Sequence, residues 1–148
     1  MAVDMKLFLN SDGQTYGPRL GSNGDFIGTE GLDTSLYVTL LTDSRASESE
    51  VTKSEERGGW IGNLANADGF ELGSLLWIVE QKRRTSAALA KAIDITEKAL
   101  DWYLEYGLLK EIGVTGVLTT SGALLTIELT TLSGNIDTRY VPLWKETV

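Results

Sequence analysis

The clearest pattern of apolar and polar positions runs from Thr85 to Tyr106 and predicts one long helix. At about 100° per residue its apolar side chains fall into two adjacent stripes, and charged side chains share the remaining face. The segment is rich in alanine and holds no glycine or proline, so its local propensity agrees with the pattern. Thr85 or Ser86 can cap its N-terminus, and Gly107 can end it. The first stripe comprises Leu89, Ile93, Leu100, Tyr103 and Leu104, and the second Ala88, Ala92, Ile95, Ala99, Trp102 and Tyr106.

The apolar arc of this helix is about 200° wide, which is more than one packing face requires. One interpretation is a central helix with a sheet on one side and a shorter helix on the other. The alternative is that Trp102 and Tyr106, in the second stripe, meet another protein chain. The pattern favours the first interpretation and leaves the second open.

The chain after Gly107 changes to segments rich in Val, Ile, Leu and Thr, which predict a three-stranded antiparallel meander. In the middle segment Leu125, Ile127 and Leu129 share one face, so one side of the sheet should be buried and the other wetter. Pro142 cannot donate to a ladder, so the last strand should end there or lie at an edge. Such an edge can pair with a strand of another protein. The strands are expected at Leu109–Thr120, Ala123–Thr131 and Ile136–Trp144.

The N-terminal half is expected to add one strand and two helices. Met5 to Leu9 is rich in strand formers. Gly31 to Thr42 has a helical apolar pattern with Asp33 as its N-cap, and Leu72 to Glu80 reads as a shorter helix. The predicted fold class is α+β: one domain over residues 1–148, with a small antiparallel sheet made of the meander and the N-terminal strand, covered by the long helix and one or two shorter helices. Residues 10–28 and 47–70 are predicted as long loops.

Charge and residue types exclude several classes of function. The chain has 21 acidic and 13 basic residues, a net charge of −8, which disfavours nucleic acid as a partner. It has no cysteine and no histidine, which removes Cys-ligated zinc, the commonest general base and the commonest metal ligand, so we expect no metal and no cofactor. An enzyme with this composition would have to use carboxylates, Lys, Tyr or Ser. A pair of catalytic carboxylates is a disfavoured alternative. No apolar run is long enough for a membrane span and no secretory signal is visible, so we expect no membrane partner and no export.

Two local features are candidates for binding another protein. Gly58 to Gly62 places Trp60 among three glycines, so that this large aromatic side chain could plug the core or anchor an interface. Lys82, Arg83 and Arg84 form the strongest basic cluster in an acidic chain. The cluster could be solvated charge near a helix end, or it could form ion pairs with an acidic partner.

Four stretches follow one another along the chain: G-L-D-T-S-L-Y-V-T-L-L-T-D-S-R-A, G-G-W-I-G, G-S-L-L-W-I-V-E and A-L-D-W-Y-L-E-Y-G. This series resembles the family of small baseplate proteins of Mu-like contractile-tailed phages, which includes gene product forty-six of Mu. The resemblance extends from about Gly24 to Trp144. That family is similar to the wedge protein that starts the sheath in T4-like phages, and to its counterpart in type VI secretion baseplates.

The resemblance implies a structural protein of the virion, located in the tail baseplate and assembled in the host cytoplasm. Its implied partners are other wedge proteins, the tail sheath protein, which adds strands to an exposed sheet edge, and tube or hub-proximal proteins. Asp43 and Arg45 fall in the family's T-D-x-R-A motif, and Trp60 in its R-G-W-W-G-D motif. The residues expected to bind partners are Asp43, Arg45, Trp60, Lys82, Arg83, Arg84, Trp102 and Tyr106.

The chain also departs from the family pattern. Gly58, Ile61, Asn63 and Leu75 stand where the family has Arg, Trp, Asp and Arg, and Arg57 is a candidate to replace one missing group. Two further functions stay open: a carboxylate-based cell-wall hydrolase of the tail, and a free cytoplasmic regulatory domain that binds one protein.

Overall fold

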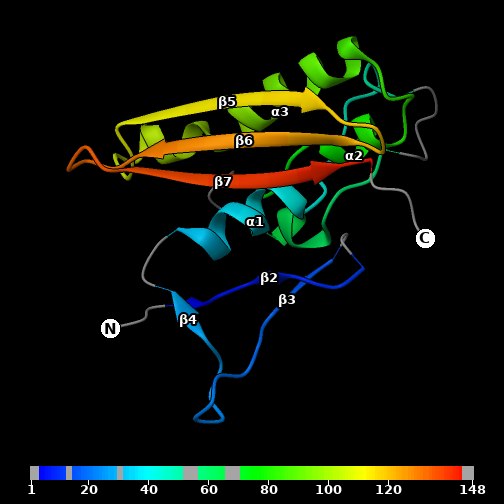
Figure 1. Cartoon of the computed structure of the whole chain (residues 1–148). Coiled ribbons are helices and arrows are strands. Elements are labelled where there is room, and N and C mark those ends of the chain that lie inside the picture. The colour runs from blue at the N-terminus through cyan, green and yellow to red at the C-terminus, as the bar shows by residue number, and fades with distance from the viewer. Residues whose placement is uncertain (1–3, 13–14, 30–31, 52–56, 66–70, 145–148) are drawn as a thin grey trace.

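The computed structural model describes residues 4–12, 15–29, 32–51, 57–65 and 71–144. A three-stranded sheet carries helices on one face, and short strands from the N-terminal part form an arm below it (Figure 1). The predicted α+β class, with a long central helix, is confirmed.

The C-terminal sheet is the predicted antiparallel meander. Its strands β5 (Glu111–Leu118), β6 (Ala123–Thr130) and β7 (Ile136–Leu143) pair in the order β5-β6-β7. Alternate side chains of β6 are buried because that face packs on the helices, as expected for Leu125, Ile127 and Leu129. Pro142 lies in β7, which is an edge strand of this sheet, as its missing N–H predicts.

The long helix α3 (Ser86–Glu105) lies behind the sheet and contacts β5 and both shorter helices (Figure 1). Its N-cap is Thr85, whose side chain accepts a hydrogen bond from the Ala88 N–H at 3.1 Å. At its C-terminus Gly107 takes φ +66°, and the Leu108 N–H donates to the Tyr103 carbonyl at 2.9 Å, which is a Schellman ending. The predicted caps and the interpretation as a central helix are therefore confirmed.

Two shorter helices pack against α3. The first, α1 (Asp33–Leu41), starts one residue after Leu32, which occupies the N-cap position without a side-chain cap hydrogen bond. The prediction that Asp33 caps this helix is therefore wrong. Its carboxylate instead forms an ion pair with Arg139 of β7, and this long-range partner outcompetes the local cap. The second, α2 (Leu76–Glu80), confirms the predicted short helix but begins four residues later than expected.

The N-terminal strand does not join the meander. Its predicted span is divided between β1 (Asp4–Met5), which pairs with β4 (Gly28–Thr29), and β2 (Phe8–Leu9), which pairs with β3 (Tyr16–Gly17). This arm is attached to α1, because the Thr34 hydroxyl donates to the Met5 carbonyl and the Tyr16 ring stacks on Tyr37 at 4.5 Å between centroids. Residues 10–28 thus contain more structure than a plain loop. In the second predicted loop, the described part holds one 3₁₀ helix, η2 (Ile61–Ala65), and residues 52–56 and 66–70 lie outside the described residues.

Candidate interaction surface

The T-D-S-R-A and G-S-L-L-W motifs, about 30 residues apart in the chain, are held together by backbone hydrogen bonds. The Ser74 N–H donates to the Thr42 carbonyl and the Ser44 N–H donates to the Ser74 carbonyl, both at 2.9 Å. These bonds place Asp43 beside Ser74 in a parallel bridge. The buried Ser74 hydroxyl donates to the Leu40 carbonyl at 2.6 Å. The T-D-S-R-A segment is therefore attached to the segment that leads into α2.

Two glycines, one in the glycine-rich motif and one directly before Ser74, pack in this unit at distances that exclude side chains. Gly58 has φ +63°, and a Cβ atom there would lie 2.8 Å from the Trp77 ring. Gly73 has φ +119°, and its Cβ atom would lie 2.5 Å from the Thr42 carbonyl oxygen. The Trp77 indole N–H donates to the Ser44 carbonyl at 2.9 Å. Three separate stretches of the sequence thus form one unit, which we call the motif cluster (residues 42–46, 57–63 and 72–77).

Asn63, one of the departures from the family pattern, and Arg57, the candidate to replace a missing group, have defined roles in the motif cluster. Arg57 donates from Nε to the Ala46 carbonyl at 2.7 Å, and the Ala46 N–H donates to the Arg57 carbonyl at 2.8 Å. Asn63 binds both backbone groups of Leu72, donating from Nδ2 to the carbonyl at 2.8 Å and accepting from the N–H at 2.9 Å. An amide side chain can donate from its nitrogen while it accepts at its oxygen, whereas an ionised carboxylate can only accept. Asn63 therefore connects η2 directly to the chain that precedes α2.

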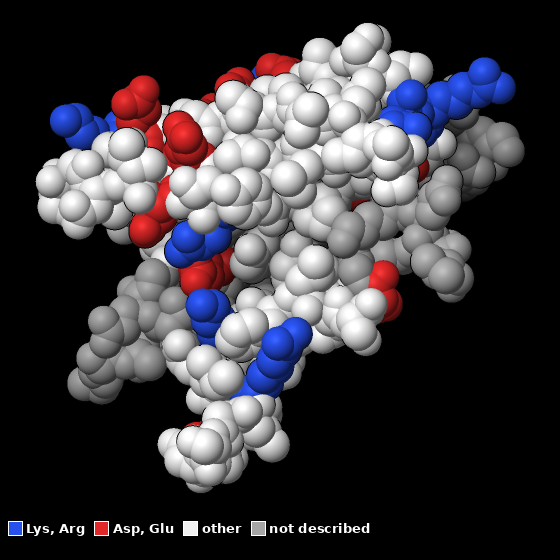
Figure 2. Space-filling model, in the orientation of Figure 1, with Lys and Arg blue, Asp and Glu red and all other residues white. Residues whose placement is uncertain are grey.

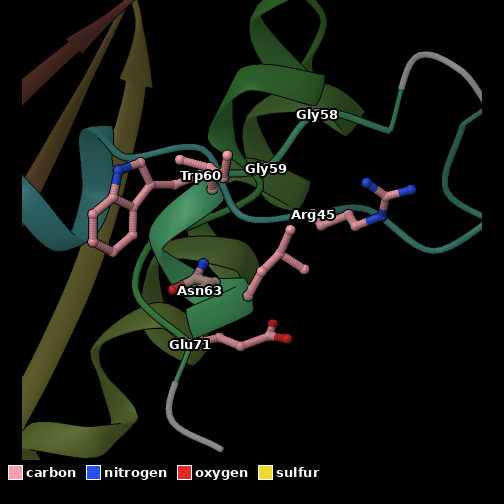
Figure 3. Close-up of a pocket in the computed structure, with 8 residues that line it drawn as sticks. Arg45, Gly58, Gly59, Trp60, Asn63 and Glu71 are labelled. Atoms are coloured by element: carbon pink, nitrogen blue, oxygen red, sulfur yellow. The ribbon is translucent and has the colours of Figure 1, made fainter. Parts of the chain in front are cut away.

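Trp60 lies at the surface of the motif cluster. Its side chain is 49% exposed, so the alternative that it plugs the core is wrong. The ring lies over Gly62, where a Cβ atom would be 2.2 Å from it. A pocket of about 180 Å³ opens beside it, with Arg45 and Glu71 pointing to one side and the Trp60 ring lying on the other (Figure 3). The prediction that Trp60 anchors an interface stays a prediction.

The most exposed apolar side chains of this region, Ile61 and Leu64, are not among the predicted binding residues. Ile61 is 79% exposed and Leu64 is 82% exposed, and no residue of η2 is buried. The available signal was two aliphatic residues at a spacing of three, in a glycine-rich stretch that otherwise reads as a loop.

A second hollow, of about 330 Å³, connects the motif cluster with the C-terminal half of α3. Ser44, Glu71 and Trp102 are among the residues that line it. The Trp102 ring is half-buried and stacks on Tyr103 at 3.8 Å between centroids. Tyr106 meets the edge of Trp102 at 6.3 Å and is 68% exposed. Because Glu71 lines both hollows, the structure brings Arg45, Trp60 and Trp102 into one region.

Electrostatics around Asp43 are unfavourable for ionised carboxyl groups. Burial raises the pKa of the Asp43 carboxyl above its ordinary value. The pKa of Glu80, at the end of α2, is raised first by burial and then by the negative charge of Asp43. The two side chains are therefore close enough to repel one another.

The basic cluster lies apart from this region and is not uniform. Arg84 donates hydrogen bonds to the carbonyl groups of Thr119, Thr120 and Gly122 in the turn between β5 and β6, two of them at 3.3 Å. Lys82 and Arg83 are exposed and form no ion pair with any residue that the structure describes. Because α3 has 20 residues and is about 30 Å long, the cluster and Trp102 lie toward opposite ends of it.

The outer face of the meander is the largest uncharged area in view. In Figure 2 charged side chains gather around the margin and few lie near the centre. Register places Thr115, Thr126 and Tyr140 side by side on this face, and Tyr140 is exposed.

Among the described residues, no cluster of three or more acidic side chains could hold a metal ion, and no helix is both long and apolar enough to cross a bilayer.

Comparison with known proteins gives consistent matches. The model of the family described as phage protein GP46 matches residues 32–136. A relative from Escherichia phage Mu, named baseplate protein gp46, is 30% identical over 115 residues, which cover 76% of this chain and 78% of the relative. A relative from Haemophilus influenzae, named Mu-like prophage FluMu protein gp46, is 34% identical over 85 residues, which cover 57% of this chain and 56% of that protein. The match to the family model includes the entire motif cluster.

Proposed function

We propose a function from one premise: the chain belongs to the phage protein GP46 family. It is a structural subunit of a phage tail baseplate. Within a contractile tail it occupies the wedge and links other wedge proteins to the first ring of sheath subunits. The link to the sheath is a strand of a neighbouring subunit that pairs with an open edge of the C-terminal sheet. The observation that carries this proposal is a meander with an outer edge on either side that no described strand covers.

Of the two edges, β5 is better suited to receive a strand. Every residue of β5 has an N–H, whereas β7 contains Pro142, and a proline weakens an edge as a pairing template. β7 is also tied to α1 through the ion pair between Arg139 and Asp33. A complete set of donors and acceptors along β5 is what β-strand addition requires.

Proline substitution tests this edge without removing the ladder to β6. The Thr119 N–H donates to the Gly122 carbonyl across the hairpin, so by alternation the N–H groups of Leu118 and Ile112 point away from β6. The double variant Ile112→Pro and Leu118→Pro removes two outward donors. The matched control, Ile112→Ala and Leu118→Ala, changes the same side chains and keeps both N–H groups.

In a phage or prophage that depends on this gene, the alanine control should restore sheathed tails in electron micrographs. The proline variant should yield baseplates that retain the chain but start few sheaths. Normal sheath assembly by a folded proline variant would reject β5 as the receiving edge. Absence of the chain from purified tails would reject the baseplate role itself.

The hydrolase alternative has a direct test. Purified protein added to permeabilised host cells or to isolated cell wall should cause no fall in turbidity. A fall in turbidity that Asp43→Asn abolishes would replace the structural proposal by an enzymatic one.

A further inference from the structure

The η2 helix displays apolar side chains instead of burying them. A short helix is normally held by packing an apolar face, because isolated turns are marginal in water. η2 has no buried residue, yet Ile61 and Leu64 are the two most exposed large apolar side chains described in the chain. Neither side chain stabilises the isolated fold through burial, so the pair is free to contact another molecule.

The geometry of a 3₁₀ helix combines the two side chains into one feature. With three residues per turn, positions i and i+3 eclipse, so Ile61 and Leu64 project in the same direction. We call this pair the η2 knob. It borders the 180 Å³ pocket, whose other lining side chains include Arg45 and Glu71 (Figure 3).

The knob is held in place by polar contacts and glycine packing. Asn63, between the two knob residues, makes two hydrogen bonds to the backbone of Leu72. The Asn63 N–H also donates to the Trp60 carbonyl at 3.1 Å, which closes the first turn. Gly59 approaches Arg45 so closely that a Cβ atom would lie 2.9 Å from the Arg45 Cβ atom. A turn fixed in this way presents its apolar side chains with little further loss of entropy on binding.

Area and charge indicate what covers the knob. Two aliphatic side chains offer roughly 200 Å² of apolar surface, whereas a stable interface buries about 800 Å² on each partner. The knob is thus one anchor within a larger contact. A second copy of this chain is disfavoured as the occupant, because each copy carries a net charge of −8 and two copies repel. The favoured occupant is a different protein that offers an apolar recess and a neutral or basic rim.

We propose that the η2 knob inserts into an apolar recess on a different baseplate protein and anchors this chain in the assembly. The proposal rests on the baseplate role given above. It adds a second attachment point, separate from the sheet edge, with Ile61 and Leu64 as the specificity-determining contacts. Glu71, which lines the pocket beside the knob, fits a basic side chain at the rim of that recess.

The first experiment places a photo-crosslinking amino acid at residue 61 or 64 and isolates tails after irradiation. Leu20, which is 64% exposed on the N-terminal arm, serves as the matched position for background labelling. We expect residues 61 and 64 to crosslink to one polypeptide other than this chain, and mass spectrometry to place the linkage among apolar residues. A crosslink to a second copy, or labelling no stronger than at residue 20, would overturn the proposal.

The second experiment replaces the knob by Ile61→Ser with Leu64→Ser. Because neither side chain is buried, the purified variant should unfold at the temperature of the wild type. Its retention in purified baseplates should fall at least about tenfold, since each buried aliphatic side chain contributes about that factor to affinity. Leu20→Ser should be retained normally.

The two proposals fail in different ways. If the chain with intact knob is absent from purified tails, the baseplate role is wrong. If the chain is present and the serine variant is retained as well as the wild type, the baseplate role stands and the knob proposal is wrong.

Discussion

Two adjacent arginines, Arg83 and Arg84, should differ sharply in their contribution to stability. The Arg84 guanidinium donates to three carbonyl groups of the β5–β6 turn and joins the start of α3 to the sheet. Arg83 is exposed and forms no ion pair with any residue that the structure describes. Arg84→Ala removes the guanidinium donor from all three carbonyl groups, of which only Gly122 keeps a second donor among the described residues, the Thr119 N–H, and it frees the segment before α3. Arg83→Ala is the matched control, since it removes the same side chain one position away.

The size of the effect follows from the bonds that are lost. A hydrogen bond from a charged donor contributes about 1.5–3 kcal/mol when buried, and the Arg84 site is largely exposed, so the three bonds together are worth about 2 kcal/mol. For a domain of this size that corresponds to a fall in melting temperature of about 4–8 °C. Arg83→Ala should change the free energy of unfolding by less than about 0.5 kcal/mol.

Thermal and urea unfolding followed by circular dichroism measure both variants under one condition. Equal stability of the two variants would refute the assigned role of Arg84.

The result also bears on the design of binding experiments. Because reversal of both arginine charges would disturb the fold as well as the surface, the basic cluster should be tested through Lys82 and Arg83 alone.

Three further predictions concern single side chains. Asn63→Asp should lower the free energy of unfolding by about 1–3 kcal/mol at neutral pH, because a carboxylate oxygen would face the Leu72 carbonyl. This loss should shrink on acidification, since a protonated carboxyl group can donate. Urea unfolding that shows no loss at neutral pH would contradict the hydrogen bonds assigned to Asn63. Glu80→Gln should raise the melting temperature at neutral pH, because the raised pKa of Glu80 means that its ionised form opposes folding. The gain should disappear below the unfolded-state pKa of about 4.3. A gain that does not depend on pH would exclude the ionised carboxylate as its cause. Burial and the neighbouring Tyr37 raise the pKa of Tyr16 to about 12. The free energy of unfolding should therefore be constant with respect to this group below about pH 10 and should fall as the pH rises toward 12. A difference spectrum between wild type and Tyr16→Phe that shows Tyr16 titrating near pH 10 would contradict the buried stack.

The sequence predicts best those elements whose causes are local. The helix from Ser86 to Glu105 has its period, its propensity and both caps within its own segment. The meander has alternating β-branched residues and short turns between neighbouring strands. The predicted bounds of the helix and of the three strands are close to those observed.

The errors arise where a distant residue decides the outcome. Asp33 has the character of an N-cap, but Arg139, 106 residues away, takes its carboxylate. The span from Met5 to Leu9 reads as one strand, but its two ends pair with different partners, and strands of two residues leave no periodicity to detect. Nothing local distinguishes Arg84 from Arg83, because the carbonyl groups that bind Arg84 lie about 35 residues further along the chain.

The candidate surface was predictable in part. The motifs containing Arg45 and Trp60 do come together, and Trp102 lies beside them. That convergence depends on the bridge between Asp43 and Ser74 and on close glycine packing, which no single motif reveals. The exposure of Ile61 and Leu64 depends on η2 facing away from the core, and only the fold decides that orientation.

A density map of intact purified tails at side-chain resolution tests the central claim most directly. The account predicts that this chain is found in the baseplate, with a strand of another subunit hydrogen-bonded along β5 so that the C-terminal sheet gains a fourth strand. A baseplate in which both outer edges of that sheet remain unpaired would contradict it.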